Sequence, residues 1–172
     1  MMSLQLLKTT IIGTLAGMLT ASTPALAVSK LYDSAASVTL KDGKPCFYTL
    51  AKISNPPPDY MKGMGMSFAV FNEATGSKGY AWNTWFASWT KPLPTSPALC
   101  VPYGVASPDQ NKQLAKPLPR DTPLSFAMTG EHGKHGVGFC VRKNSSGRDY
   151  LSTVAWQDGA ASCTSEPLRS AP

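Results

Sequence analysis

Prolines and glycines interrupt this chain at intervals too short for long helices. The 172 residues include 15 prolines and 14 glycines, which is above the usual proportion and favours many short elements joined by turns. Because 42% of the residues are apolar, the chain has the material for a core, which excludes wholesale disorder. A chain of this length predicts a single domain.

Residues 1–27 have the pattern of a secretory signal peptide. Lys8 is their only charged residue, an apolar run covers residues 11–19, and Ala25-Leu26-Ala27 forms the small-x-small site that a signal peptidase cleaves. An uncleaved membrane anchor is the alternative, but the apolar run has only about half of the ~20 residues that span a bilayer. We expect cleavage after Ala27, one exported domain at residues 28–172 and no membrane segment after cleavage.

All four cysteines lie in the expected exported domain. An even number of cysteines in an exported chain predicts two disulfides in an oxidising compartment. A zinc site is disfavoured, because no two of the cysteines form a C-x-x-C pair. The location is therefore expected to be periplasmic or secreted. Spacing leaves the pairing open among Cys46, Cys100, Cys140 and Cys163.

Turn signals separate seven or eight short segments with the patterns of β-strands. Asp42-Gly43 is a strong hairpin signal, because glycine tolerates a positive φ. Residues 107–119 are predicted to form a long surface loop, and no segment has the pattern of an amphipathic helix. Together these features predict an all-β fold, a small disulfide-stapled β-sandwich for which an immunoglobulin-like layout is one option. The expected strands cover residues 37–40, 46–53, 64–71, 80–89, 100–104, 122–129, 136–141 and 149–156.

Residues 80–89 form the most aromatic segment. On a regular strand, Tyr80 and Trp82 would share one face, while Trp85 and Trp89 would share the other. This pattern fits a strand buried on both sides, or an aromatic row left open for a partner. Tryptophan and tyrosine dominate interface hot spots, and tryptophan also stacks on sugars. The candidate partner-binding residues are Trp82, Trp85, Trp89 and Tyr150.

The sequence offers few groups for catalysis. His132 and His135 stand in a glycine-rich stretch typical of a flexible, solvated loop, with a metal site as the minor alternative. G-x-S-x-G, P-loop and Rossmann patterns are missing. The 10 acidic residues mostly flank turns, so no pair of catalytic carboxylates stands out. We expect a protein that is not an enzyme and has no cofactor, catalytic residue or metal ligand.

The net charge is +6, and it falls to +5 when the signal peptide with Lys8 is removed. The basic residues are scattered singly, and export removes most nucleic-acid partners, so no nucleic-acid binding is expected. Such a charge favours acidic protein surfaces or the anionic cell envelope.

Several short motifs follow one another along the chain: Val38-x-Leu40-x-Asp42-Gly43-Lys44-Pro45-Cys46-Phe47, Cys100-x-x-Tyr103-Gly104, Lys116-Pro117-Leu118 and Gly138-Phe139-Cys140-Val141. Taken in this order, they resemble one bacterial family. Between Ser37 and Cys163 the chain resembles the type VI secretion system immunity periplasmic (lipo)protein family. The resemblance implies a small β-rich periplasmic protein that binds and neutralises a toxin effector injected by a neighbouring cell. The chain departs from this family in one respect, because no cysteine lies at the cleavage site to carry a lipid, so outer-membrane tethering is not expected.

Two other binding functions stay open at this point. One is a module for glycans or peptidoglycan, with the tryptophans as stacking platforms. The other is a periplasmic lysozyme inhibitor, because Ser146-Gly147-x-x-Tyr150 resembles a stretch of those inhibitors. The basic charge of this chain disfavours the second function, since lysozyme is itself basic.

Overall fold

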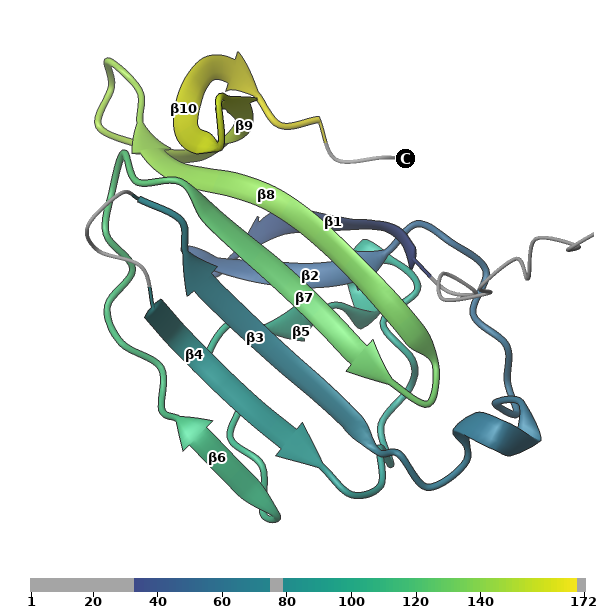
Figure 1. Ribbon diagram of the computed structural model, residues 1–172. Helices are drawn as coiled ribbons and strands as arrows, with labels where there is room; N and C mark the ends of the chain where they lie inside the picture. Colours follow the sequence, from purple (N-terminus) through teal and green to yellow (C-terminus); the bar gives the residue numbers. More distant parts are fainter. Residues whose placement is uncertain (1–32, 75–78, 170–172) are drawn as a thin grey trace, which may run out of the picture.

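The computed structural model describes residues 33–74 and 79–169, and the predicted signal peptide lies outside them (Figure 1). The all-β fold is confirmed, with ten strands and two short 3-10 helices in the described residues. This exceeds the seven or eight strands expected, because residues 110–113 and 160–167 also form strands where the sequence predicts a loop and a tail. The elements are β1 (Asp33–Lys41), β2 (Lys44–Thr49), η1 (Asp59–Met61), β3 (Met66–Asn72), β4 (Gly79–Phe86), η2 (Pro97–Leu99), β5 (Val101–Pro102), β6 (Gln110–Gln113), β7 (Leu124–Gly130), β8 (Gly133–Lys143), β9 (Asp149–Gln157) and β10 (Ala160–Pro167).

The strands form one continuous, curled sheet. Hydrogen-bonded neighbours follow the order β5-β2-β1-β8-β7-β3-β4-β6, and β9 and β10 extend from β8. Strand β1 first pairs in parallel with β8 and then, from Ala36, in an antiparallel manner with β2. Strand β8 likewise pairs with β7 up to Phe139 and with β9 from Cys140. The curl places β1, β2 and β5 behind β3, β4 and β7 (Figure 1), and a sandwich of two separate sheets is not confirmed.

Two hairpin turns have the backbone geometry that an Asp-Gly pair favours. Asp42 and Gly43 adopt φ values of 52° and 74° between β1 and β2, as the sequence predicts. Asp158 and Gly159 adopt 49° and 77° between β9 and β10. Positive φ at both central residues is the mark of the two-residue turn that matches the twist of paired strands. The second turn explains why the expected tail folds back as β10.

Aromatic side chains from both layers fill the core. Phe47 of β2 stacks on Phe126 of β7 with ring centroids 3.9 Å apart. Phe139 of β8 meets Phe47 edge-on at 5.5 Å. Trp82 of β4 is 1% exposed, and its ring lies parallel to that of Phe68 at 6.3 Å. Burial of side chains this large stabilises the fold by roughly 2 to 3 kcal/mol each, so this cluster holds the two layers together.

A β-bulge in β4 changes the predicted faces of the aromatic segment. Val70 of β3 pairs with Trp82, but the next residue, Phe71, pairs with Tyr80, so Ala81 is an extra residue. Trp82 therefore faces the core, while Tyr80 faces outward and is 50% exposed. The prediction that Tyr80 and Trp82 share a face is wrong, because alternation stops at the bulge.

The segment predicted as a surface loop contains an edge strand. Strand β6 pairs with the far side of β4. Asn111 accepts hydrogen bonds from the Ser107 N–H and the Thr84 hydroxyl, both at 2.9 Å, and donates to the Ser107 carbonyl oxygen at 2.7 Å. These polar contacts attach β6 to the sheet, and a hydrophobicity pattern does not reveal them.

The two disulfides connect Cys46 to Cys100 and Cys140 to Cys163. Two disulfides were predicted, and the pairing that spacing left open is now resolved. The first bridge ties β2 to the residue before β5, a strand of two residues that has few hydrogen bonds of its own. The second bridge joins β8 to β10 although β9 lies between them in the hydrogen-bond order. The second bridge therefore holds the curled β9–β10 hairpin against β8.

Replacement of each cysteine pair by alanine tests how much the bridges stabilise the fold. The bridged residues are 54 and 23 positions apart, so loop entropy predicts losses of about 4 kcal/mol for C46A/C100A and about 3 kcal/mol for C140A/C163A. Urea unfolding followed by tryptophan fluorescence measures both losses. A larger loss for the shorter loop would contradict the entropic origin of the effect.

Candidate partner-binding site

The predicted partner-binding residues do not form one surface. Trp82 is in the core, so its expected contact with a partner is wrong. Trp85 is half-buried on the outer face of the sheet, where its indole donates to the Met64 carbonyl oxygen at 3.2 Å. Trp89 is half-buried in the proline-rich segment after β4 and donates to the carbonyl oxygen of Pro92 at 3.2 Å.

Tyr150 lies far from these tryptophans in the fold. It is half-buried on β9 and pairs with Arg142 of β8. The bulge and the core packing thus separate the four aromatic residues among different environments. The aromatic row does not mark a common binding surface.

The two histidines are buried, which corrects the predicted solvated loop. His135 lies on β8 and is 3% exposed. Its Nε2 donates to the His132 carbonyl oxygen at 2.9 Å, a direction assigned because a carbonyl only accepts. Its Nδ1 lies within hydrogen-bonding distance of the hydroxyl groups of Ser34 and Thr49. Both ring nitrogens are engaged inside the protein, so His135 has a structural role.

His132 bonds to a different segment. Its Nδ1 lies 3.1 Å from the Ser54 carbonyl oxygen, and its Nε2 lies 3.6 Å from a carboxylate oxygen of Glu131. In the part of the chain that the structure describes, no three His, Cys, Asp or Glu side chains gather as metal ligands. The H-x-x-H pair therefore fastens the segment after β2 to the β7–β8 hairpin.

Three segments far apart in the sequence meet at a hollow of about 460 Å³, which we name the basic hollow. They are the start of β2, the residues after β5, and the stretch between β6 and β7. These segments contain three of the four motifs on which the family resemblance rests. The basic hollow is lined by Gly43, Lys44, Pro45, Tyr103, Gly104, Ala115, Lys116, Pro117, Leu118, Arg120, Val141 and Asp149.

Hydrogen bonds lock the three segments together. The Tyr103 N–H donates to the Pro45 carbonyl oxygen at 2.8 Å. The Tyr103 hydroxyl lies 2.7 Å from the Lys116 carbonyl oxygen and 3.0 Å from that of Ala81. The Lys116 N–H also donates to the Ala81 carbonyl oxygen at 2.9 Å. Both backbone groups of Lys116 are held, which fixes the point from which its side chain extends.

The basic hollow carries an excess of positive charge. Arg120 forms a bidentate ion pair with Asp149 at 3.1 Å, so these two charges offset each other. Lys44 and Lys116 are exposed, and neither forms an ion pair with a described residue. Lys41 lies opposite Lys44 in the β1–β2 ladder and adds to the positive potential. The hollow therefore attracts anionic groups such as carboxylates.

The lining of the basic hollow combines cationic, apolar and hydrogen-bonding groups. Its one carboxylate, Asp149, is already paired with Arg120. Burial raises the pKa of Tyr103 to about 12, so at neutral pH this phenol remains a hydrogen-bond donor.

The residues that matter here were not among the predicted site residues. In the sequence the basic residues are scattered singly, and Lys44 and Lys116 lie far apart in the chain. The available signal was their position beside proline in two of the quoted motifs. Only the fold shows that Tyr103 links these motifs.

Comparisons of the chain with protein-family models, curated proteins and solved structures found no match. The geometry of the basic hollow is therefore the main basis for assigning a function. Within residues 33–74 and 79–169, no helix has the length and hydropathy to cross a membrane.

Tyr103→Phe tests the hydrogen bond that organises the basic hollow. Loss of the hydroxyl should lower the free energy of unfolding by about 1 kcal/mol at neutral pH. The folded pKa of Tyr103 is raised from 10.0 to about 12, so above pH 10 the unfolded chain releases a proton that the folded protein keeps. This contribution is fully present below pH 10 and is lost as the pH rises toward 12. Urea unfolding of both proteins from neutral pH to pH 12 should show their difference shrinking, and a constant difference would contradict the assignment.

Proposed function

We propose that this protein is an exported, non-catalytic immunity protein that binds and neutralises a toxin acting in the periplasm, an effector of a type VI secretion system. One observation carries the proposal, namely the convergence of three motif-bearing segments on the basic hollow. The motifs support immunity through the family resemblance. Their convergence supports a shared role in contact with a partner.

The charge of the hollow supports an acidic partner segment. Lys44 and Lys116 would each form a charge-assisted hydrogen bond with a carboxylate of the toxin. Pro45, Pro117 and Leu118 line the same hollow and offer apolar contact to the remainder of the inserted segment. Complementary charge also speeds the encounter of two proteins, which suits an inhibitor that must act before the toxin damages the cell.

The first disulfide supports a rigid contact surface. Cys46 directly follows Pro45, and Cys100 precedes Tyr103 by three positions, so one bridge restrains two of the three converging segments. A surface that is ordered before binding loses less conformational entropy when the partner arrives. Disulfides are also typical of proteins that work in oxidising compartments such as the periplasm.

A lysozyme-inhibitor function is disfavoured by the same charge. Ser146 and Gly147 lie in the exposed turn between β8 and β9, and Tyr150 follows on β9. Lysozyme is a basic enzyme, and the excess lysines of the basic hollow would repel it. We therefore retain the immunity function as the proposal.

A double charge reversal, Lys44→Glu with Lys116→Glu, tests the proposal. Cells that lack the gene should become sensitive to siblings that deliver the effector, and the wild-type chain should restore protection. The double variant should fail to protect, and calorimetry should show its affinity for the purified effector reduced by at least about tenfold. Both lysines are exposed, so the fold should be retained.

The matched control is Lys52→Glu with Lys134→Glu. These lysines are also exposed and lie outside the lining of the basic hollow, so the control changes the net charge equally and should protect fully. Unchanged sensitivity of the deletion strain would overturn the immunity function. Full protection by the Lys44/Lys116 double variant would exclude the basic hollow as the contact surface.

A further inference from the structure

A second hollow of about 370 Å³ lies on the outer face of β3, β4 and β7. The strand register places Asn83 beside Ala69, Ala69 beside Ala127, and Ala127 beside Gly136. Because three of these four residues are alanine or glycine, the side chains of this row extend less far from the sheet than those of the rows on either side. The row forms a trough that crosses the strands, which we name the outer trough.

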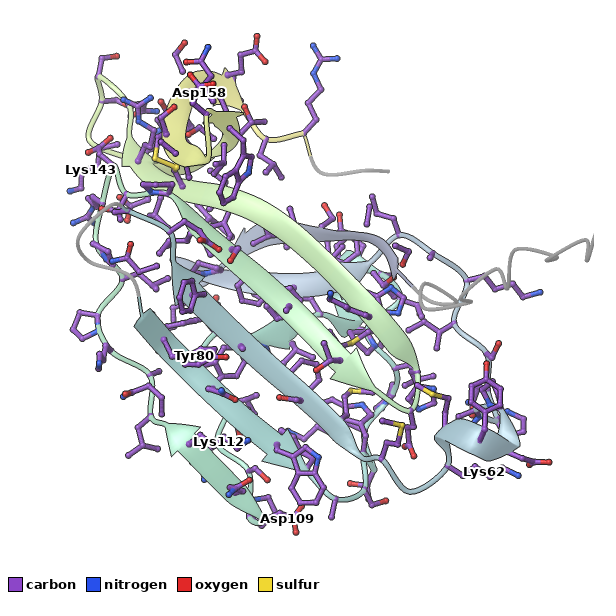
Figure 2. The ribbon with its side chains drawn as sticks, viewed as in Figure 1. Lys62, Tyr80, Asp109, Lys112, Lys143 and Asp158 are labelled. Carbon is purple, nitrogen blue, oxygen red and sulfur yellow. A yellow bond between two sulfur atoms is a disulfide. The ribbon has the colours of Figure 1, made fainter. Side chains whose placement is uncertain are left out.

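An aromatic pair stands on one side of the outer trough. The bulge places Tyr80 opposite Phe71 on the outer face. Their rings meet edge to face, with centroids 5.3 Å apart and planes 80° apart, so Phe71 supports the exposed ring of Tyr80. Figure 2 shows Tyr80 on the face of the sheet turned toward the viewer, with Lys112 of β6 on the same side. An exposed, supported aromatic ring is a platform for a flat apolar surface.

Asn83 is an unpartnered polar side chain within the outer trough. It is 8% exposed and lines the hollow, yet its side-chain amide makes no hydrogen bond with a described residue. The amide offers both donors and acceptors. A hydroxyl group of a ligand in the trough can therefore both donate to Asn83 and accept from it.

The charges around the outer trough balance. Glu73 and Lys112 both line it, and the Ser125 hydroxyl donates to one carboxylate oxygen of Glu73 at 2.5 Å. The second carboxylate oxygen and the Lys112 ammonium group remain able to bond a ligand. A balanced pair favours a neutral ligand, in contrast to the basic hollow, where the unpaired lysines favour an anion.

These observations together describe a ligand with an apolar flat face and a rim of hydroxyl groups. We propose that the outer trough binds a neutral pyranose unit of a glycan. Tyr80 stacks against the C–H face of the sugar, and Asn83, Glu73 and Lys112 bond its hydroxyl groups. Hydrolysis is not part of the proposal, because glycosidases use two carboxyl groups and Glu73 is the one carboxylate in this lining.

An extended peptide fits the outer trough less well. A peptide that adds to a sheet does so through unpaired backbone groups at an edge strand. The trough crosses β3 and β7, whose backbone groups are paired with strands on both sides. The trough shares no lining residue with the basic hollow, so the inference is independent of the immunity function.

Titration calorimetry of residues 28–172, the chain expected after export, tests the proposal. Chitotetraose and maltotetraose serve as the neutral probes. At least one probe should bind saturably. Tyr80→Ala should weaken that binding about tenfold, and Ala127→Leu should do the same by filling the low row. Trp156→Ala is the matched control, because Trp156 is an exposed aromatic residue outside the trough, and it should bind like the wild type.

Tyr80 is half exposed, so Tyr80→Ala should keep the fold even if Ala127→Leu does not, and thermal unfolding checks both variants. Failure of both probes to bind would overturn the proposal, as would equal binding by a folded Tyr80→Ala protein. Tighter binding of an oligogalacturonate than of the neutral probes would overturn the neutral character of the site. The Lys44/Lys116 double variant should bind the sugar normally, so failure of the immunity function and failure of this proposal give different results.

Discussion

The stacking of Phe47 on Phe126 closes the curl of the sheet. Strands β2 and β7 are not neighbours in the hydrogen-bond order, because β1 and β8 lie between them. The two rings nevertheless lie 3.9 Å apart, and Phe139 and Trp82 pack around Phe47. Hydrogen bonds alone permit a more open sheet, so this aromatic contact decides how far the layers fold onto each other. It also requires Trp82 inside the core, where no partner reaches it.

The position of the basic hollow follows from this contact. Phe47 directly follows Cys46 and Pro45, so packing of its ring into the core fixes where the start of β2 meets its neighbours. The Cys46–Cys100 bridge then carries the residues before β5 along with β2. Tyr103, which is bonded to the Pro45 carbonyl oxygen, completes the arrangement. Strand β2 therefore contributes Phe47 to the core and Lys44 and Pro45 to the proposed binding surface.

Features that depend on neighbouring residues could be predicted from the sequence. The Asp42-Gly43 turn and most strand positions are of this kind, because adjacent residues determine turn conformations and strand periods. The presence of two disulfides could be predicted in another way, from the even number of cysteines in a chain expected to be exported. His135 shows the limit of such reasoning. Glycines beside it suggested a loop, but its burial depends on hydroxyl groups 101 and 86 positions away, on Ser34 and Thr49.

The candidate sites were beyond sequence reasoning for the same physical reason. The sequence does not indicate that Lys44 and Lys116 lie near each other, since Tyr103 and the core packing bring them together. The alternation rule placed Tyr80 with Trp82, because a single inserted residue in a strand leaves no clear mark in the hydrophobic pattern. The sequence thus indicated a disulfide-bridged β protein, but not the two surfaces proposed for binding.

The bulge at Ala81 connects both proposed surfaces. An extra residue in a strand disrupts the ladder locally and frees backbone groups from regular pairing. The Ala81 carbonyl oxygen instead accepts the Lys116 N–H and lies within hydrogen-bonding distance of the Tyr103 hydroxyl, on the side of the basic hollow. The same extra residue turns Tyr80 to the outer trough while Trp82 stays in the core. A regular β4 would place Tyr80 on the buried face, so the outer trough depends on this one irregularity.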